Sequence, residues 1–400
     1  MTNNGPTSRP SGPARLIMGM LVAAGILGGV EALGWALRGP PPPSGQVIQI
    51  SVAELVAEGA DTRLRHLLEP RQDVVVPPKG DRPRLVTLGG SSVRHSWATD
   101  PAVDFPLWLQ RALPQIEVVN LGTPGQTTLG ILALMPMLDR LDPDLVLLYT
   151  GHNDFSEPVF QGRLAGSRLW MLPLHRLLGR SWIYASLRGP AVSLAPPQPE
   201  ARRGVLVTDD YRATRWADQT LAIYDRQLGE IIDASPAPVA LSTLLRNADY
   251  PPTGLLALPE SQPDGDGAAC RKRVAALPLH APPGPELLAR QVDTACGPGR
   301  ALAWWYRSLA ARAAGDLATA TDHFAESLRR DPLPLRAPFE VDAVIRRRAA
   351  DHGALLIDPA EALGPLPPGA WFDDTLHPNA EGARRLAGAL APPLEAALTP

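Results

Sequence analysis

The chain contains very little cysteine and has no excess of positive charge. Cys270 and Cys296 are the only cysteines among 400 residues, and the formal net charge is −3. Two cysteines alone do not make a zinc site, and a chain without a basic surface offers no footprint for nucleic acid. These absences argue against a metal-binding module and against a nucleic-acid partner. The hydrophobic share of 45% is ample for one large domain or two smaller ones.

One apolar stretch stands at the N-terminus. Residues 16–37 carry a single charge, at Glu31, and they follow Arg9 and Arg15. That length is sufficient to cross a bilayer, and the stretch lacks a clean small-residue cleavage site. We therefore expect an uncleaved membrane anchor, with a cleaved signal peptide as the alternative. The positive residues ahead of it predict a cytoplasmic N-terminus and a body on the periplasmic side of a bacterial inner membrane.

In the periplasm Cys270 and Cys296 could pair as a disulfide, and two buried free thiols are the alternative.

The composition divides the chain into successive segments. Ser51 and Glu54 form a capping-box pattern ahead of spaced leucines, which predicts an amphipathic helix ending near Pro70. We predict a cytoplasmic tail at 1–15, the anchor at 16–37, a linker with this juxtamembrane helix at 38–80, an α/β domain in two parts at 81–245 and 336–398, and a helical insertion at 246–335.

The α/β domain is predicted from strands and helices that alternate along the chain. Such alternation is typical of a three-layer α/β/α fold with a parallel sheet, as in flavodoxin-like proteins. The predicted strands are 85–88, 116–119, 145–149, 239–243 and 355–358. The predicted helices are 105–113, 129–141, 216–234, 341–352 and 380–398.

The insertion contains a pattern for a pair of helices at residues 301–332. Trp304 opens the first helix, Gly315 and Asp316 make the turn, and Ala320 and Phe324 lie in the second. These offsets match a tetratricopeptide-like unit. A single unit cannot bury both of its faces, so we expect it to pack on the rest of the protein. It is either a docking site for a protein partner or an ordinary helical hairpin.

Four short motifs carry the residues able to do chemistry. Gly89–Ser92, Asn120–Gly125 and Gly151–Asp154 each follow a predicted strand, and Asp374–His377 returns from the far end of the chain. The carboxyl ends of parallel strands meet at one edge of the sheet, where ligands bind in such folds. The sequence therefore predicts a serine, glycine turns, an asparagine, an aspartate and a histidine at one site.

These motifs resemble blocks I, II, III and V of the SGNH, or GDSL-type, hydrolase superfamily. The resemblance implies that Ser91 is the nucleophile, that His377 is the general base and that Asp374 orients it. It also implies an oxyanion hole formed by the Ser91 and Gly125 backbone N–H groups and the Asn153 side chain. The family usually has aspartate where this chain has Gly90, which weakens the match without removing a catalytic group. Asp154 is interpreted as structural.

Four further residues are candidates for contact with substrate: His95 and His152 near the motifs, and Arg246 and Asn247 after the strand at 239–243. Residues 155–212 are rich in Leu, Trp, Arg and Pro, and we expect them to form an arm or a lid over the site.

The function that follows is hydrolysis of an acyl ester, with O-acetyl among the candidate groups, by a membrane-tethered serine esterase. The substrate would be an acylated envelope glycan or lipid, and neither a metal nor an organic cofactor is implied. An O-acyltransferase acting on an envelope polysaccharide would use the same site. A lipase acting on membrane lipids and a non-catalytic scaffold that binds a partner through the insertion are the other hypotheses.

Overall fold

The computed structural model describes residues 28–29, 31–33, 36–37, 53–66, 73–95, 100–161, 181, 216–252, 284–331 and 334–399. The chain divides into two compact units: Met1–Gln49 with Arg168–Pro197, and Ile50–Ser167 with Gln198–Pro400. In the first unit, the described residues between 28 and 37 are helical, and the Ser181 hydroxyl donates to the Glu31 carboxylate at 2.9 Å. Across the described ranges, no helix has the length and apolar character needed for a membrane crossing. Most of the predicted anchor at 16–37 lies outside them.

The second unit is built on a five-stranded sheet in the order β5-β4-β6-β7-β8. Every neighbouring pair is parallel. The central strands β4, β6 and β7 are buried along their whole length, as expected for a parallel sheet covered on both faces. The predicted α/β fold with a parallel sheet is confirmed. The strand bounds are β4 Arg84–Gly89, β5 Glu117–Asn120, β6 Leu145–Tyr149, β7 Val239–Ser242 and β8 Leu355–Ile357.

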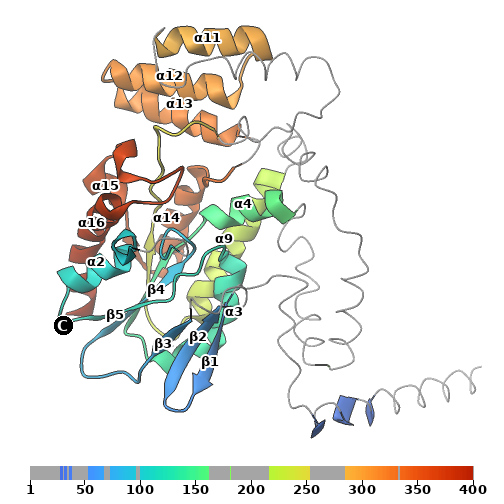
Figure 1. Ribbon diagram of the computed structural model, residues 1–400, viewed down its shortest axis with the longest axis vertical. Coiled ribbons are helices and arrows are strands. Elements are labelled where there is room, and N and C mark those ends of the chain that lie inside the picture. Colours follow the sequence, from blue (N-terminus) through green and yellow to red (C-terminus); the bar gives the residue numbers. More distant parts are fainter. Residues whose placement is uncertain are drawn as a thin grey trace, which may run out of the picture. The chain divides into compact units, whose positions relative to one another are not determined.

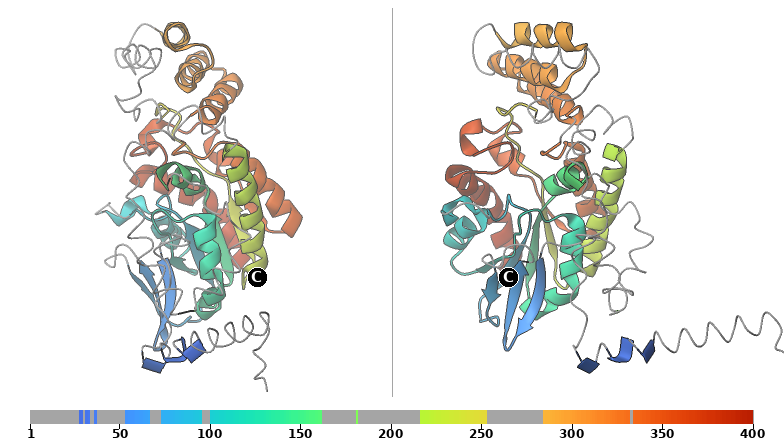
Figure 2. Two further views of the ribbon diagram at one scale, coloured as in Figure 1. Left: turned by 90° about the vertical axis from the view of Figure 1, so that its right-hand side faces the viewer. Right: turned by 45° about the vertical axis from the view of Figure 1, so that its right-hand side comes forward.

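Helices cover both faces of this sheet (Figures 1 and 2). Helices α2 (Phe105–Ala112) and α16 (Ala380–Leu398) pack together on one face, and α3 (Thr128–Leu138), α9 (Trp216–Ala234) and α14 (Glu340–His352) on the other. α16 shows why such a segment folds: the Asn379 side chain caps it, and buried residues recur every three or four positions. The remaining elements of this domain are α4 His152–Gln161, α15 Pro359–Leu363 and 3₁₀ turns at Pro101–Val103, Asp139–Leu141 and Gly369–Trp371.

The predicted juxtamembrane helix is wrong, because the segment forms a β-hairpin. Strands β1 (Ala53–Glu58) and β2 (Asp61–His66) pair antiparallel, and β3 (Val74–Val76) adds to β2. Leu55 and Leu64 lie opposite each other and are both buried. Gly59 takes a left-handed φ of 64° in the turn, a conformation that interrupts a helix and that glycine adopts without strain. The turn and the cross-strand pairing outweigh the local capping pattern.

The helical insertion forms α11 (Pro285–Cys296), α12 (Ala301–Ala313) and α13 (Leu317–Arg329), with α12 and α13 at the predicted helix pair. The three share a small core that includes Val292, Trp305 and Phe324. Buried serines join the pair: Ser308 donates to the Ala320 carbonyl at 2.7 Å, and Ser327 donates to the Ala301 carbonyl at 2.9 Å. Its tetratricopeptide character stays a prediction. Of the predicted arm at 155–212, residues 162–180 and 182–212 lie outside the described residues.

Candidate active site

Ser91 lies in a tight turn immediately after β4. The N–H groups of Val93 and Arg94 donate to the Gly90 carbonyl at 3.0 and 3.3 Å and close this turn. A Cβ at Gly89 would lie 2.1 Å from the Tyr149 carbonyl oxygen, on the neighbouring strand β6. Only glycine permits that approach, so the backbone leaves the sheet at Gly89 and presents Ser91 at its carboxyl edge.

The structure brings Ser91 together with His377 and Asp374 from the other end of the chain. Ser91 Oγ lies 2.8 Å from His377 Nε2, and His377 Nδ1 lies 2.6 Å from Asp374 Oδ2. The other carboxylate oxygen of Asp374 accepts the backbone N–H groups of Leu376 and His377, each at 2.9 Å. This arrangement can pass a proton from a serine hydroxyl to an imidazole that a carboxylate orients.

The charge state of Asp374 follows from its surroundings. Burial raises its pKa, but the hydrogen bond and charge of His377 and the N–H groups of Leu376 and His377 outweigh that effect, and the pKa is lowered to about 2. The carboxylate is therefore ionised at neutral pH and can stabilise an imidazolium ion.

Three hydrogen-bond donors are available for an oxyanion: the N–H groups of Ser91 and Gly125 and the Asn153 side-chain amide. Asn153 lies in the first turn of α4, and its Nδ2 donates to the Gln126 carbonyl at 3.0 Å. Gly125, next in sequence to Gln126, has a left-handed φ of 75°. Within the described ranges, the N–H groups of Ser91 and Gly125 donate to no protein acceptor. Such groups are suited to hold an oxyanion.

Asp154 has a structural position. Its carboxylate accepts the Thr128 backbone N–H at 3.0 Å and the Thr128 hydroxyl at 2.5 Å, and so holds the first turn of α3. The sequence interpretation of Asp154 agrees with this contact.

His95 packs against the ring of His377. The two ring centroids are 5.2 Å apart in an edge-on arrangement. The Asp104 carboxylate accepts the His95 backbone N–H at 2.8 Å and lies 3.3 Å from its Nδ1. The His95 side chain is 1% exposed. It therefore contacts His377, the candidate base. The sequence placed His95 near the motifs but gave no sign of its contact with Asp104.

His152 is buried, and its predicted contact with substrate stays a prediction. Its Nδ1 accepts the Ala337 backbone N–H at 3.1 Å, and its other ring nitrogen is buried as well. Burial, followed by the positive charges of Arg246 and His377, lowers the pKa of His152 well below its usual value. The ring is neutral and ties α4 to the segment before α14.

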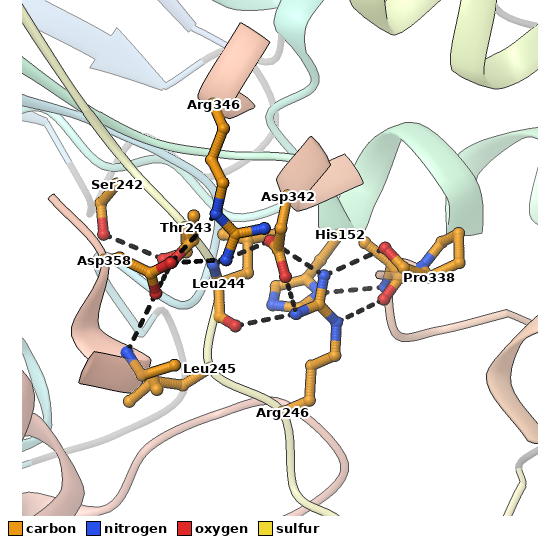
Figure 3. A network of polar contacts seen from close by, with 12 residues as sticks. His152, Ser242, Thr243, Leu244, Leu245, Arg246, Pro338, Asp342, Arg346 and Asp358 are labelled. Atoms are coloured by element: carbon orange, nitrogen blue, oxygen red, sulfur yellow. Dashed lines mark hydrogen bonds and ion pairs between the residues drawn. The ribbon is translucent and has the colours of Figure 1, made fainter. Parts of the chain in front are cut away.

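Arg246 is also a structural residue and not the predicted substrate contact. Figure 3 shows its guanidinium enclosed by acceptors. All five N–H groups donate: to the carbonyls of Leu244, Ala337 and Pro338, and twice to Asp342. The side chains of Arg246 and Asp342 are 2% and 5% exposed, so this is a buried ion pair. Nothing in the sequence indicated Asp342 as its partner.

Asn247 faces the turn that carries Asp374, and not an open site. Its side-chain amide donates to the Asp374 backbone carbonyl at 2.7 Å. The remaining prediction concerns the cysteines: Cys296, at the end of α11, is disulfide-bonded, and Cys270 lies outside the described residues. Among the residues described, no group of three His, Cys, Asp or Glu side chains is placed to hold a metal ion.

No curated protein matches the sequence. Similar solved structures include TesA, at 15% identity over 79% of this chain and 99% of that one, with a TM-score of 0.36. Others are a lipase/acylhydrolase from Enterococcus faecalis (13% identity, 80% and 98% covered, TM-score 0.36) and the acetyl xylan esterase AlAXEase (13% identity, 77% and 97% covered, TM-score 0.34).

The family is decided by a sequence model and not by these distant structures. The model of the GDSL-like lipase/acylhydrolase family matches residues 87–385, which is well over half of the chain and contains every motif residue named above. The protein therefore belongs to the GDSL-like lipase/acylhydrolase family and is an ester-bond hydrolase.

Proposed function

We propose that this protein cleaves an acyl ester through a Ser-His-Asp triad formed by Ser91, His377 and Asp374. The observation that carries the proposal is the continuous pair of hydrogen bonds, 2.8 Å from Ser91 Oγ to His377 Nε2 and 2.6 Å from His377 Nδ1 to Asp374. A serine hydroxyl becomes an effective nucleophile only when a positioned base accepts its proton.

In the proposed mechanism Ser91 Oγ attacks the ester carbonyl carbon while its proton moves to His377. The carbonyl oxygen becomes an oxyanion, held by the N–H groups of Ser91 and Gly125 and by the Asn153 amide. Collapse of this intermediate expels the alcohol, which takes the proton from His377, and leaves an acyl-serine. His377 then accepts a proton from water, whose oxygen attacks the acyl group. The second intermediate collapses to the acid, and His377 returns its proton to Ser91 Oγ.

We propose further that residues 16–37 anchor the enzyme in a bacterial inner membrane, with the catalytic domain in the periplasm. The support is the length of this stretch, which carries a single charge at Glu31, and the arginines at 9 and 15. The substrate would then be an O-acetyl or other acyl ester of an envelope glycan or lipid. An alkaline phosphatase reporter fused after residue 45 is expected to be active, and one fused after residue 15 inactive.

The experiment for the triad uses p-nitrophenyl acetate, butyrate and octanoate with a fluorophosphonate probe. Ser91→Ala is expected to lower kcat by at least about 10³-fold and to abolish phosphonate labelling. Ser92→Ala is the matched control, since Ser92 is an equally buried neighbour, and it is expected to stay within about threefold of wild type. Full activity in Ser91→Ala, or labelling at another residue, would refute the triad.

A further inference from the structure

Residues 247–251, which follow β7, form a short segment that contacts both the turn carrying Asp374 and His377 and helix α12 of the insertion. Asn247 stands at its start and makes two hydrogen bonds to that turn. Its backbone N–H donates to the Thr375 carbonyl at 3.1 Å, and its side-chain Nδ2 donates to the Asp374 carbonyl at 2.7 Å. These carbonyls belong to consecutive peptide units between the Asp374 and His377 side chains, so their position sets the position of both.

Asn247 is itself held from the opposite side. The Asp249 backbone N–H donates to its Oδ1 at 3.0 Å, and Arg336 Nη1 donates to its carbonyl at 2.6 Å. Arg336 is 1% exposed, and it also donates to the carbonyls of Tyr250 and Pro251 at 2.8 and 3.0 Å. A buried guanidinium shared among three carbonyls leaves this segment little freedom to move.

The helical insertion supplies the next set of contacts. Trp305 of α12 is fully buried, and its Nε1 donates to the Ala248 carbonyl at 2.9 Å. Arg312, about two helical turns further along α12, donates to the Asp249 carboxylate at 2.5 Å. The other oxygen of that carboxylate accepts the Gly369 N–H at 2.7 Å, just ahead of the turn. The insertion therefore contacts the two residues that directly follow Asn247.

The turn needs such support. It lies in a loop, and the Asp374 side chain is 41% exposed. Productive geometry at a catalytic group is lost with displacements of about 0.5–1 Å, which cost up to about a hundredfold in rate. Loops undergo motions of that size readily, whereas segments fixed by several buried hydrogen bonds do not.

We propose that Asn247 is a positioning residue for the Asp374–His377 turn, and that α12 serves as its support through Trp305 and Arg312. The proposal rests on the triad proposed above. It gives the insertion a function within this chain, separate from any docking of a partner: the insertion keeps the general base aligned with Ser91.

The test compares Asn247→Asp and Asn247→Ala, using p-nitrophenyl acetate turnover and the second-order rate of fluorophosphonate labelling. Asn247→Asp keeps the size of the side chain and the acceptor for Asp249, but it replaces the donor to Asp374 with a charged carboxylate oxygen, whereas Asn247→Ala removes the donor without adding a charge. We expect both variants to lower kcat about 10- to 100-fold with KM within about threefold, and to slow labelling in parallel. The final extent of labelling reports the folded fraction, so misfolding reduces the extent and misplacement reduces the rate.

The insertion is tested by Arg312→Met, with Arg290→Met as the matched control. Arg290 lies on α11 in an exposed pair with Glu286 and does not contact the segment. We expect Arg312→Met to lower kcat about three- to tenfold and Arg290→Met to leave it unchanged.

The outcomes separate this proposal from the one on which it rests. If Ser91→Ala is inactive but both Asn247 variants keep wild-type kcat, the positioning role is refuted and the triad stands. Loss in Asn247→Asp alone would show an effect of the added charge and also refute the positioning role. Activity in Ser91→Ala would refute the triad itself.

Discussion

Gly90 offers the sharpest test of the oxyanion site, because the Asn153 amide occupies the space that a side chain there would fill. A Cβ built on Gly90 would lie 2.2 Å from Asn153 Nδ2, more than 1 Å short of the 3.4 Å at which ordinary contacts begin. The φ of Gly90 is not in the left-handed region, so alanine meets no backbone strain at this position. The perturbation in Gly90→Ala is therefore a displacement of one amide group.

The expected magnitude follows from that distance. Moving Nδ2 by about 1 Å breaks its 3.0 Å hydrogen bond to the Gln126 carbonyl and takes the donor away from its place near Ser91. Removal of one oxyanion donor typically lowers kcat about 10²- to 10³-fold, near 3 kcal/mol. The interaction is made in the transition state, so kcat and kcat/KM are expected to fall together.

The assay is a double-mutant cycle with Asn153→Ala, measured by p-nitrophenyl acetate hydrolysis. If Gly90→Ala acts by displacing the amide, it has nothing further to displace once Asn153 is alanine. We expect the second substitution to add less than about threefold to the loss in Asn153→Ala, which is strong non-additivity for neighbouring residues. Circular dichroism and thermal unfolding check that each variant is folded.

Two results would contradict this reasoning. Wild-type kcat in Gly90→Ala would show that Asn153 can serve from another position. A full hundredfold loss on top of Asn153→Ala would show that Gly90 acts on Ser91 directly. Either outcome would also change the interpretation of the aspartate that the family usually carries at this position.

The remaining predictions concern the carboxylate of the triad and the buried ion pair. Asp374→Asn is expected to lower kcat at pH 7 about 10³- to 10⁴-fold. Since the pKa of Asp374 is about 2, its carboxylate is fully charged above pH 4 and loses its charge only as the pH falls towards 2. A fall in kcat/KM between pH 7 and pH 4 therefore reports the protonation of another group. That fall should persist in Asp374→Asn. Arg246→Met leaves the Asp342 carboxylate buried without its partner, and we expect urea unfolding to show about 3–5 kcal/mol of lost stability. Most of it should return in the double variant with Asp342→Leu, and an undiminished loss there would mean that the carbonyl contacts of Arg246 dominate.

The comparison of sequence and structure is clearest at the strands. β4 and β6 fall within one residue of their predicted bounds, since their apolar runs are buried on both faces and need no distant partner to be recognised. The hairpin of β1 and β2 was missed because its capping-box pattern and spaced leucines also suit a helix. Only the pairing of Leu55 with Leu64 across the Gly59 turn decides between the two.

The site likewise contains residues that the sequence identified and residues whose roles only the folded structure revealed. Local motifs determined Ser91, Asn153, Asp374 and His377, because each follows a strand or shares a turn, and the order of parallel strands brings such positions to one edge. What Arg246, Asn247 and His152 do was decided by residues about 90 to 185 positions away.

The physical reason lies in the range of the forces. Turn geometry and hydrophobic periodicity arise from neighbouring residues, so the amino-acid sequence by itself determined the α/β fold, the parallel sheet and the motif residues. Buried polar side chains take their roles from the acceptors that folding places around them. The tertiary structure alone decided that Arg246 pairs with Asp342, that Asn247 holds the turn, and that the Asn153 amide fills the space beside Gly90.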